Sequence, residues 1–144
     1  MIKMNETLII LQARMSSSRL PNKVLMPILN KPMLAHQIAR LQSVKTPHKL
    51  IIATSIEKSD DRIEVLCRQL NIICFRGDLN DVLARYYQAA VKFKSKDIQT
   101  NIIRVTGDCP LIDSDIIDNV IKLFLTSNSD YCSNCAPATL PDGL

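Results

Sequence analysis

The chain has 144 residues, enough for one domain with a hydrophobic core. Hydrophobic residues make up 47% of it and charged residues 22%, which is ordinary for a soluble globular protein, and no apolar run approaches the roughly 18 residues that span a bilayer. The net charge of +4 is mild, the basic residues form no run, and aromatic residues are only 4%, so an anionic small molecule is a better partner than nucleic acid. The N-terminus shows no signal-peptide pattern, so we expect a cytoplasmic protein without a membrane partner.

The first half of the chain alternates apolar runs with segments of helical periodicity. Residues 7–12 are typical of a buried strand. Pro32 suits the first position of a helix that runs to about residue 44, with its apolar residues on one face. A second strand follows over residues 49–54. Ser59 or Asp60 can cap the next helix, whose inward face is predicted to be Ile63, Leu66, Cys67 and Leu70.

The second half repeats the alternation. A third strand is predicted over residues 72–75, after which Gly77 turns the chain into a helix over residues 79–93. A fourth strand over residues 101–106 leads to a helix with acidic residues in its first turn, where they complement the helix dipole. Residues 129–134 suggest a last strand. The inward faces of the two helices are predicted to be Val82, Leu83, Tyr86 and Ala90, and then Ile117, Val120, Ile121 and Phe124.

Strands that alternate with helices of this length predict a mainly parallel sheet covered on both faces, a three-layer αβα arrangement in the α/β class. In such sheets, ligands bind outside the carboxyl ends of the strands. Four polar loops follow the predicted strands and would meet at that edge, at residues 12–23, 53–61, 76–81 and 106–113. We therefore expect the functional site there.

The loop after the first strand concentrates cations and hydroxyls. Arg14, Arg19 and Lys23 are spaced five and four residues apart, and three serines lie between the first two of them. Arginine can bridge two phosphate oxygens and lysine adds a point charge, so a nucleoside triphosphate suits this loop. Asn22 tolerates the left-handed turn that glycine would otherwise supply. A solvated basic loop is the alternative that composition leaves open, and no Walker motif is present.

A Gly-Asp pair ends the fourth predicted strand. Asp108, facing a triphosphate loop, would be a natural Mg²⁺ ligand, because that ion binds one or two carboxylates together with substrate phosphates. The alternative is an ordinary aspartate in a turn. For Asp113 we favour the role of a helix cap.

Several motifs carry a resemblance to a known family. "QARMSSSRLPNKVL" followed by "NKPMLAHQIARL" resembles the opening signature of the cytidylyltransferases that activate acidic sugars, the 3-deoxy-manno-octulosonate and acylneuraminate enzymes. "RVTGDCPLID", "GDLNDVLARYYQAA" and "TLPDGL" are closest to the spore coat polysaccharide biosynthesis protein F branch. The resemblance implies a Rossmann-like nucleotide-diphospho-sugar-transferase fold. It also implies Mg²⁺-dependent transfer of CMP from CTP to an acidic sugar for a surface polysaccharide, with release of pyrophosphate.

The resemblance also assigns roles to individual residues. The family motif carries over with Ala13, Arg14, Ser17, Arg19, Leu20, Pro21 and Lys23 in place. Its arginines and lysine would hold the CTP phosphates, and the backbone near Ala13 would lie by the base. Arg14, Lys23 and Asp108 are the implied catalytic residues, with Asp108 as the metal ligand. Arg104 and the loop that holds Asp78, Asn80 and Asp81 would lie near the nucleotide or the sugar.

The family extends beyond the last residue of this chain. The resemblance therefore implies that residues 1–144 are a single nucleotide-binding domain, the N-terminal part of a longer enzyme. A second metal carboxylate, most of the sugar pocket and a homodimer-forming segment would lie downstream. Two alternatives stay open: a nucleotide-binding remnant without turnover, and a sugar-1-phosphate nucleotidyltransferase or glycosyltransferase of related fold. The glycine-rich loop of sugar-1-phosphate nucleotidyltransferases is absent. The Asp-Ser-Asp at residues 113–115 matches the D-x-D metal motif of glycosyltransferases in its letters, but it lies in a predicted helix turn.

The chain has five cysteines, and Cys132 and Cys135 form a lone C-x-x-C motif. A zinc site needs a second pair of ligands, and a redox motif needs a helix to begin at the cysteines. Neither pattern is present, so we expect small buried thiols.

Overall fold

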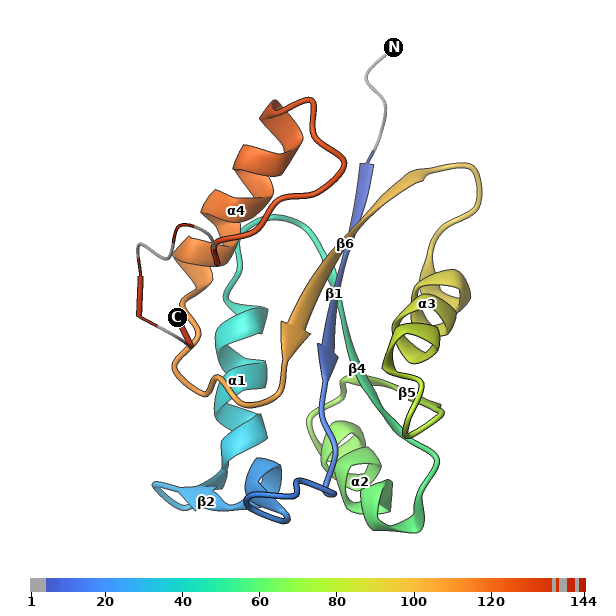
Figure 1. Ribbon diagram of the computed structural model, residues 1–144, viewed down its shortest axis with the longest axis vertical. Helices are drawn as coiled ribbons and strands as arrows, with labels where there is room; N and C mark the ends of the chain where they lie inside the picture. The colour runs from blue at the N-terminus through green and yellow to red at the C-terminus, as the bar shows by residue number, and fades with distance from the viewer. Residues whose placement is uncertain (1–4, 136, 138–139, 142) are drawn as a thin grey trace.

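Figure 1 shows the protein as a computed structural model, which describes residues 5–135, 137, 140–141 and 143–144. Its centre is a sheet of four parallel strands in the order β5-β4-β1-β6. These strands are β1 (Asn5–Gln12), β4 (Lys49–Ser55), β5 (Ile73–Gly77) and β6 (Gln99–Thr106). A short antiparallel hairpin, β2 (Pro27–Ile28) and β3 (Lys31–Pro32), stands apart from the sheet. The four predicted strands are confirmed, and the strand predicted over residues 129–134 is wrong, because that segment has no β structure.

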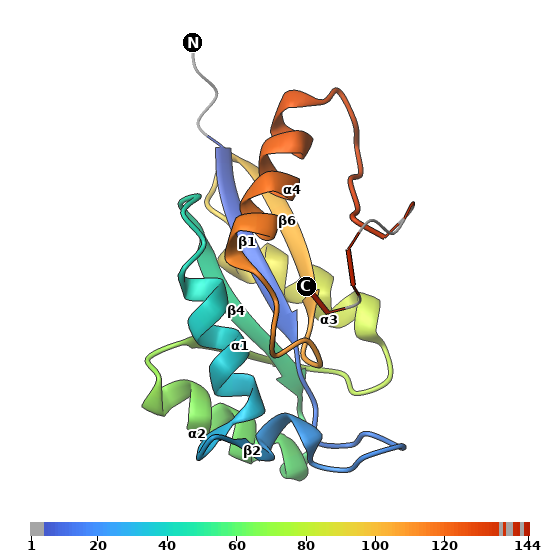
Figure 2. The ribbon, with the colours of Figure 1, turned by 90° about the vertical axis from the view of Figure 1, so that its left-hand side faces the viewer.

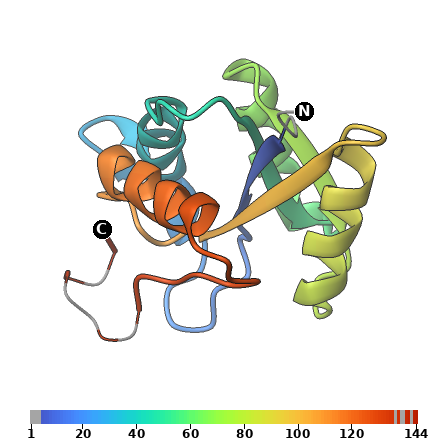
Figure 3. The same ribbon diagram turned by 90° about the horizontal axis from the view of Figure 1, so that it is seen from above.

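Four α-helices cover the two faces of the sheet. They are α1 (Met33–Gln42), α2 (Asp61–Gln69), α3 (Val82–Phe93) and α4 (Ser114–Thr126), with short 3₁₀ turns at Lys23–Leu25 and Lys58–Asp60. Helices α1, α2 and α4 contribute to one buried cluster, and α3 packs alone on the opposite face. Figure 3 shows α3 separated from α1 and α4 by the sheet. The predicted αβα layers are confirmed.

The core is divided by strand β1, which runs through its middle. Ile9 and Leu11 face α1, α2 and α4, whereas Leu8 and Ile10 face α3, and all four side chains are fully buried. A central parallel strand is apolar on both faces because helices cover it on both sides. This explains why residues 7–12 read as a continuous apolar run instead of an alternating one.

Two of the predicted inward residues are on the surface. Leu83 is 80% exposed, and the inward position that we assigned to it belongs to Arg85, which is fully buried. Leu70 lies just past the end of α2 and is 37% exposed. The pattern of apolar residues fails at Leu83 because a charged side chain occupies the core-facing position of this turn.

The strand order creates a crevice at one edge of the sheet. From β1 the chain moves outward through β4 and β5, and α3 then carries it back across the other face to β6 on the far side of β1. The loops that follow β1 and β6 lead to α1 and α4 on the same face and leave the carboxyl ends of two neighbouring strands, the edge at which open α/β sheets bind ligands. Figure 2 shows the long loop after β1 at this edge. In the described part of the chain no helix is long and apolar enough to cross a membrane.

Candidate nucleotide-binding site

The loop after β1 folds around Met15. Its side chain is buried, and its carbonyl accepts hydrogen bonds from the backbone N–H groups of Ser17 and Asn22, both at 2.9 Å. Asn22 adopts the left-handed conformation with φ of 65°, as its residue type predicted. The loop is thus tied to the core at its centre, while Arg14 and Arg19 remain exposed on its outer side.

A buried carboxylate fixes this loop to the next one. Asp60 accepts hydrogen bonds from the N–H of Met15 at 2.8 Å, from the N–H of Ser55 at 3.0 Å and from the hydroxyls of Thr54 and Ser55 at 2.9 and 2.5 Å. Burial alone raises the pKa of Asp60, but these donors outweigh it and the pKa lies below its usual value. The side chain makes no cap hydrogen bond to α2, so the predicted capping role of Asp60 is wrong.

The loop after β6 approaches β1 closely because it begins with glycine. A Cβ atom at Gly107 would lie 2.6 Å from the carbonyl oxygen of Gln12, closer than any side chain allows. Gln37 of α1, which is fully buried, donates from Nε2 to the carbonyl of Thr106 at 2.8 Å and holds the end of β6. These contacts position Asp108 beside the loop that follows β1. Asp113 caps α4 by accepting from the N–H groups of Asp115 and Ile116, which confirms its predicted role.

The structure brings together the predicted phosphate-binding lysine and the predicted metal ligand. Lys23 Nζ lies 3.4 Å from Asp108 Oδ2, although 85 residues separate the two along the chain. A hydrogen bond from the Thr106 hydroxyl and the charge of Lys23 lower the pKa of Asp108, against the opposing effect of burial. Asp108 is therefore an ionised carboxylate beside a cation at neutral pH.

Between these two loops lies a polar cavity of about 240 Å³. Three cationic side chains and one carboxylate line it, together with serine hydroxyls. A larger hollow of about 340 Å³ lies beside α2 and is mostly apolar, with no such convergence of charge. The residues that line the polar cavity are Gln12, Ala13, Arg14, Ser17, Ser18, Arg19, Lys23, Val24, Thr106, Gly107 and Asp108. Ala13, Arg14, Ser17, Arg19, Lys23 and Asp108, all expected at the site from the sequence, lie here.

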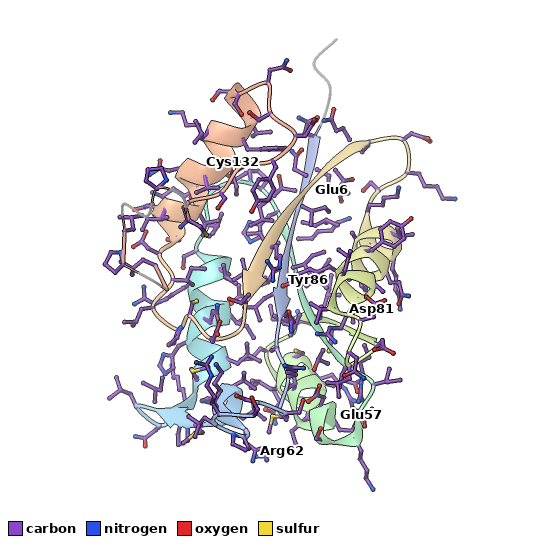
Figure 4. The ribbon with its side chains drawn as sticks, in the orientation of Figure 1. Glu6, Glu57, Arg62, Asp81, Tyr86 and Cys132 are labelled. Atoms are coloured by element: carbon purple, nitrogen blue, oxygen red, sulfur yellow. The ribbon has the colours of Figure 1, made fainter. Side chains whose placement is uncertain are left out.

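Arg104 and the loop residues Asp78, Asn80 and Asp81 were also expected near the nucleotide or the sugar, but they do not line this cavity. The Asp78 carboxylate accepts from the N–H groups of Asn80 and Asp81 at 2.7 and 2.8 Å, which stabilises its own loop. These bonds lower the pKa of Asp78. The Arg104 guanidinium lies 5.5 Å from the ring centre of Tyr86, on the face of the sheet that α3 covers. Figure 4 shows Tyr86 between α3 and the sheet, and Asp81 at the start of the helix.

The side chains at this cavity suit Mg²⁺ only if a bound phosphate compound supplies most of the oxygen atoms around the ion. Within the described residues no group of three or more histidine, cysteine or acidic side chains could hold a metal ion. Asp108 is a single, half-exposed carboxylate beside a phosphate-sized cavity, and Mg²⁺ commonly binds one or two carboxylates together with phosphate oxygens.

Cys135 is exposed and Cys132 is half-buried, so the expectation that both are buried thiols is wrong.

A parallel αβα sheet with a cationic cavity at the carboxyl ends of β1 and β6 defines this chain as an α/β protein of the nucleotidyltransferase fold. Residues 8–140 match the family model described as "Cytidylyltransferase", and the chain belongs to that family.

Curated relatives cover most of this chain. An uncharacterized protein of Methanocaldococcus jannaschii, MJ1063, is 42% identical over 124 residues, which are 86% of this chain and 49% of the relative. The spore coat polysaccharide biosynthesis protein SpsF of Bacillus subtilis is 36% identical over 132 residues, 89% of this chain and 53% of the relative. A 3-deoxy-manno-octulosonate cytidylyltransferase of Acinetobacter baumannii is 31% identical over 134 residues, 92% and 49% respectively. The chain thus spans about half the length of the curated relatives it matches.

Solved structures show the same fold. A cytidylyltransferase from Leptospira borgpetersenii superposes with a TM-score of 0.79 and 36% identity, over 86% of this chain and 50% of that one. A CMP:2-keto-3-deoxy-manno-octonic acid synthetase, solved in complex with CTP, superposes with a TM-score of 0.72 and 24% identity, over 83% and 47%. The expected fold is confirmed by these similarities.

Proposed function

We propose that this chain binds CTP in the cavity between β1 and β6, as part of an enzyme that transfers CMP to an acidic sugar for a surface polysaccharide. The observation that carries the proposal is the cavity itself, which is lined by Arg14, Arg19, Lys23 and Asp108. Family membership supports the cytidine nucleotide, and the likeness to the spore coat protein and to the octulosonate enzyme supports the acidic sugar.

In this reaction the protein would mainly position the phosphate groups and neutralise their negative charge. An oxygen of the sugar attacks the α-phosphorus, the new P–O bond forms, and the bond to the β-phosphate breaks, so that pyrophosphate leaves with the electron pair. Arg14, Arg19 and Lys23 would bind the phosphate oxygens and stabilise the charge that develops on pyrophosphate. The backbone at Ala13 and the Ser17 hydroxyl would orient the nucleotide. The sugar hydroxyl loses its proton to solvent or to a group outside this chain.

Asp108 and the phosphates would hold Mg²⁺, which supplies charge neutralisation at the α-phosphate when it is bound. The ion pair with Lys23 keeps Asp108 ionised before the nucleotide arrives. The proposal extends to a cytoplasmic homodimer for the complete protein.

Calorimetric titration of CTP, UTP, ATP and GTP in the presence of Mg²⁺ tests the proposal. We expect binding that is selective for CTP, and a loss of about tenfold or more in affinity for Lys23→Ala, since a phosphate loses a charged donor. Lys58→Ala is the matched control, because this lysine lies in an exposed turn outside the cavity. Equal binding of all four nucleotides, or a Lys23→Ala variant that binds CTP as the wild type does, would contradict it. Assaying CMP-sugar formation then separates an enzyme from a nucleotide-binding protein without turnover.

A further inference from the structure

Arg85 is the largest fully buried side chain of the described residues, and it has no acidic partner within ion-pair distance. It lies in the first turns of α3, under the loop that follows β5. Its Nη1 donates to the carbonyl of Asp78 and, at 3.2 Å, to that of Leu79. Its Nε and Nη2 are buried and have no hydrogen-bond partner among the described residues.

Such an arrangement is costly for the folded protein. A buried guanidinium without a carboxylate pays a large desolvation cost, and each unsatisfied donor adds to it. Holding two backbone carbonyls uses only Nη1, so the anchoring of the loop does not account for the remaining donors. A charged group of this kind is expected where a ligand completes its hydrogen bonds.

The neighbouring charges indicate which ligand that is. Burial lowers the pKa of Arg85, and the nearby positive charge of Arg14 lowers it further, while Tyr86, Asp60 and Asp78 act in the opposite direction. Arg14 belongs to the loop that lines the polar cavity. Arg85 lies at the same carboxyl edge of the sheet as this loop, because a Cβ at Gly77, the last residue of β5, would be 3.1 Å from its Cγ. An anion at this edge would pair with both guanidinium groups.

We propose that Arg85 is an anion-binding residue of the nucleotide site, whose free Nε and Nη2 bind a phosphate group of the nucleotide that lies between Arg85 and Arg14. The proposal rests on the proposed function, because the phosphate would belong to the nucleotide bound in the polar cavity, whose lining does not itself include Arg85. Arg85 is fully buried and holds the carbonyls of Asp78 and Leu79, so the phosphate can reach its free donors only if this short loop shifts.

The test compares Arg85→Met and Arg85→Lys with the wild type by calorimetry, with CTP and inorganic tripolyphosphate as separate probes. Methionine removes the charge and keeps an unbranched side chain. We expect Arg85→Met to weaken the binding of both probes about 10- to 100-fold. Arg68→Met is the control, because Arg68 is an exposed arginine of α2, and it should bind within about twofold of wild type.

A purely structural role gives a different result. It predicts that Arg85→Met lowers the thermal midpoint without ligand and leaves the affinities unchanged, and that result would overturn the proposal. Our proposal predicts weaker binding of both probes whatever the change in midpoint, because methionine removes the buried charge and also the Nη1 bonds to the carbonyls of Asp78 and Leu79. If Arg85→Met does not fold, Arg85→Lys decides the question. Lysine keeps a donor for the loop carbonyls but lacks the additional N–H groups of the guanidinium. Wild-type affinity of this variant for both probes would refute the anion-binding role of Arg85.

The two probes also separate this proposal from the proposed function. Wild-type protein that binds tripolyphosphate through Arg85 but does not prefer CTP over other nucleotides contradicts the cytidine assignment and supports the role of Arg85. Selective CTP binding that is insensitive to Arg85 substitutions contradicts the role of Arg85 alone. Binding of neither probe by the wild type would contradict both.

Discussion

Replacing Asp60 with asparagine should weaken the whole fold, because this carboxylate joins two loops from inside the protein. Asparagine keeps one acceptor oxygen for the N–H of Met15, and the hydroxyls of Thr54 and Ser55 can rotate to accept from the new amide. The backbone N–H of Ser55 can only donate, and it loses its 3.0 Å hydrogen bond to a charged acceptor. Losing a hydrogen bond to a charged acceptor and leaving the buried N–H unsatisfied costs about 1.5–3 kcal/mol, so we expect the free energy of unfolding to fall by about that amount.

Urea unfolding at neutral pH measures this loss directly. The matched control is Asp61→Asn, the adjacent acidic residue, which is 51% exposed and pairs with Arg76. A surface pair of this kind contributes about 1 kcal/mol or less. If Asp60→Asn costs no more than Asp61→Asn, the carboxylate does not hold the loops, and the reasoning from its four hydrogen bonds is refuted. In the wild type the contribution should also fade as the pH falls below the ordinary value of 3.8, because the pKa of Asp60 is lowered in the folded state.

Three more predictions concern other parts of the molecule. The hydrogen bond from Lys49, followed by the bonds from Ser95, lowers the pKa of Glu6 to about 2. The stability that ionised Glu6 contributes is therefore complete above pH 4.5 and is lost as the pH falls toward 2. Glu6→Gln should reduce the loss of unfolding free energy across this pH interval, and an unchanged pH dependence would count against the pairing. Gly107→Ala places a Cβ 2.6 Å from the backbone oxygen of Gln12 and should destabilise the protein by about 1–3 kcal/mol in thermal unfolding, whereas an unchanged midpoint would show that the β6 loop can retreat. Asp108→Asn should keep the fold and abolish the strengthening of CTP binding by Mg²⁺ in calorimetry; a full Mg²⁺ effect in this variant would remove Asp108 from the metal site.

Local periodicity was enough to predict the four sheet strands and the helices that follow them. Residues 7–12, for example, are apolar on both faces because β1 is central, and that property is visible in the sequence itself. The hairpin of β2 and β3 was not predicted. Its turn places Leu29 and Asn30 at positive φ, and a leucine in that conformation gives no sequence signal for a turn.

The site was predictable where a motif is contiguous and was missed where the chain folds back on itself. The cavity residues at 13–23 and Asp108 were expected from short motifs, and the structure brings them together. Asp60 looked like a helix cap, because the donor that gives it another role, the N–H of Met15, is 45 residues away. Gln37 and Arg85 were not singled out, because a polar residue on a helix predicts an exposed side chain unless its distant partners are known.

The separation of Lys23 and Asp108 along the chain also determines when the site can form during synthesis and folding. The loop after β1 is made early in synthesis, but its opposite wall comes from the end of β6, which pairs with β1. The cavity therefore forms only once β6 has been made and has paired with β1. Nucleotide that binds across β1 and β6 would stabilise this strand pairing by mass action, and so would raise the stability of the sheet itself.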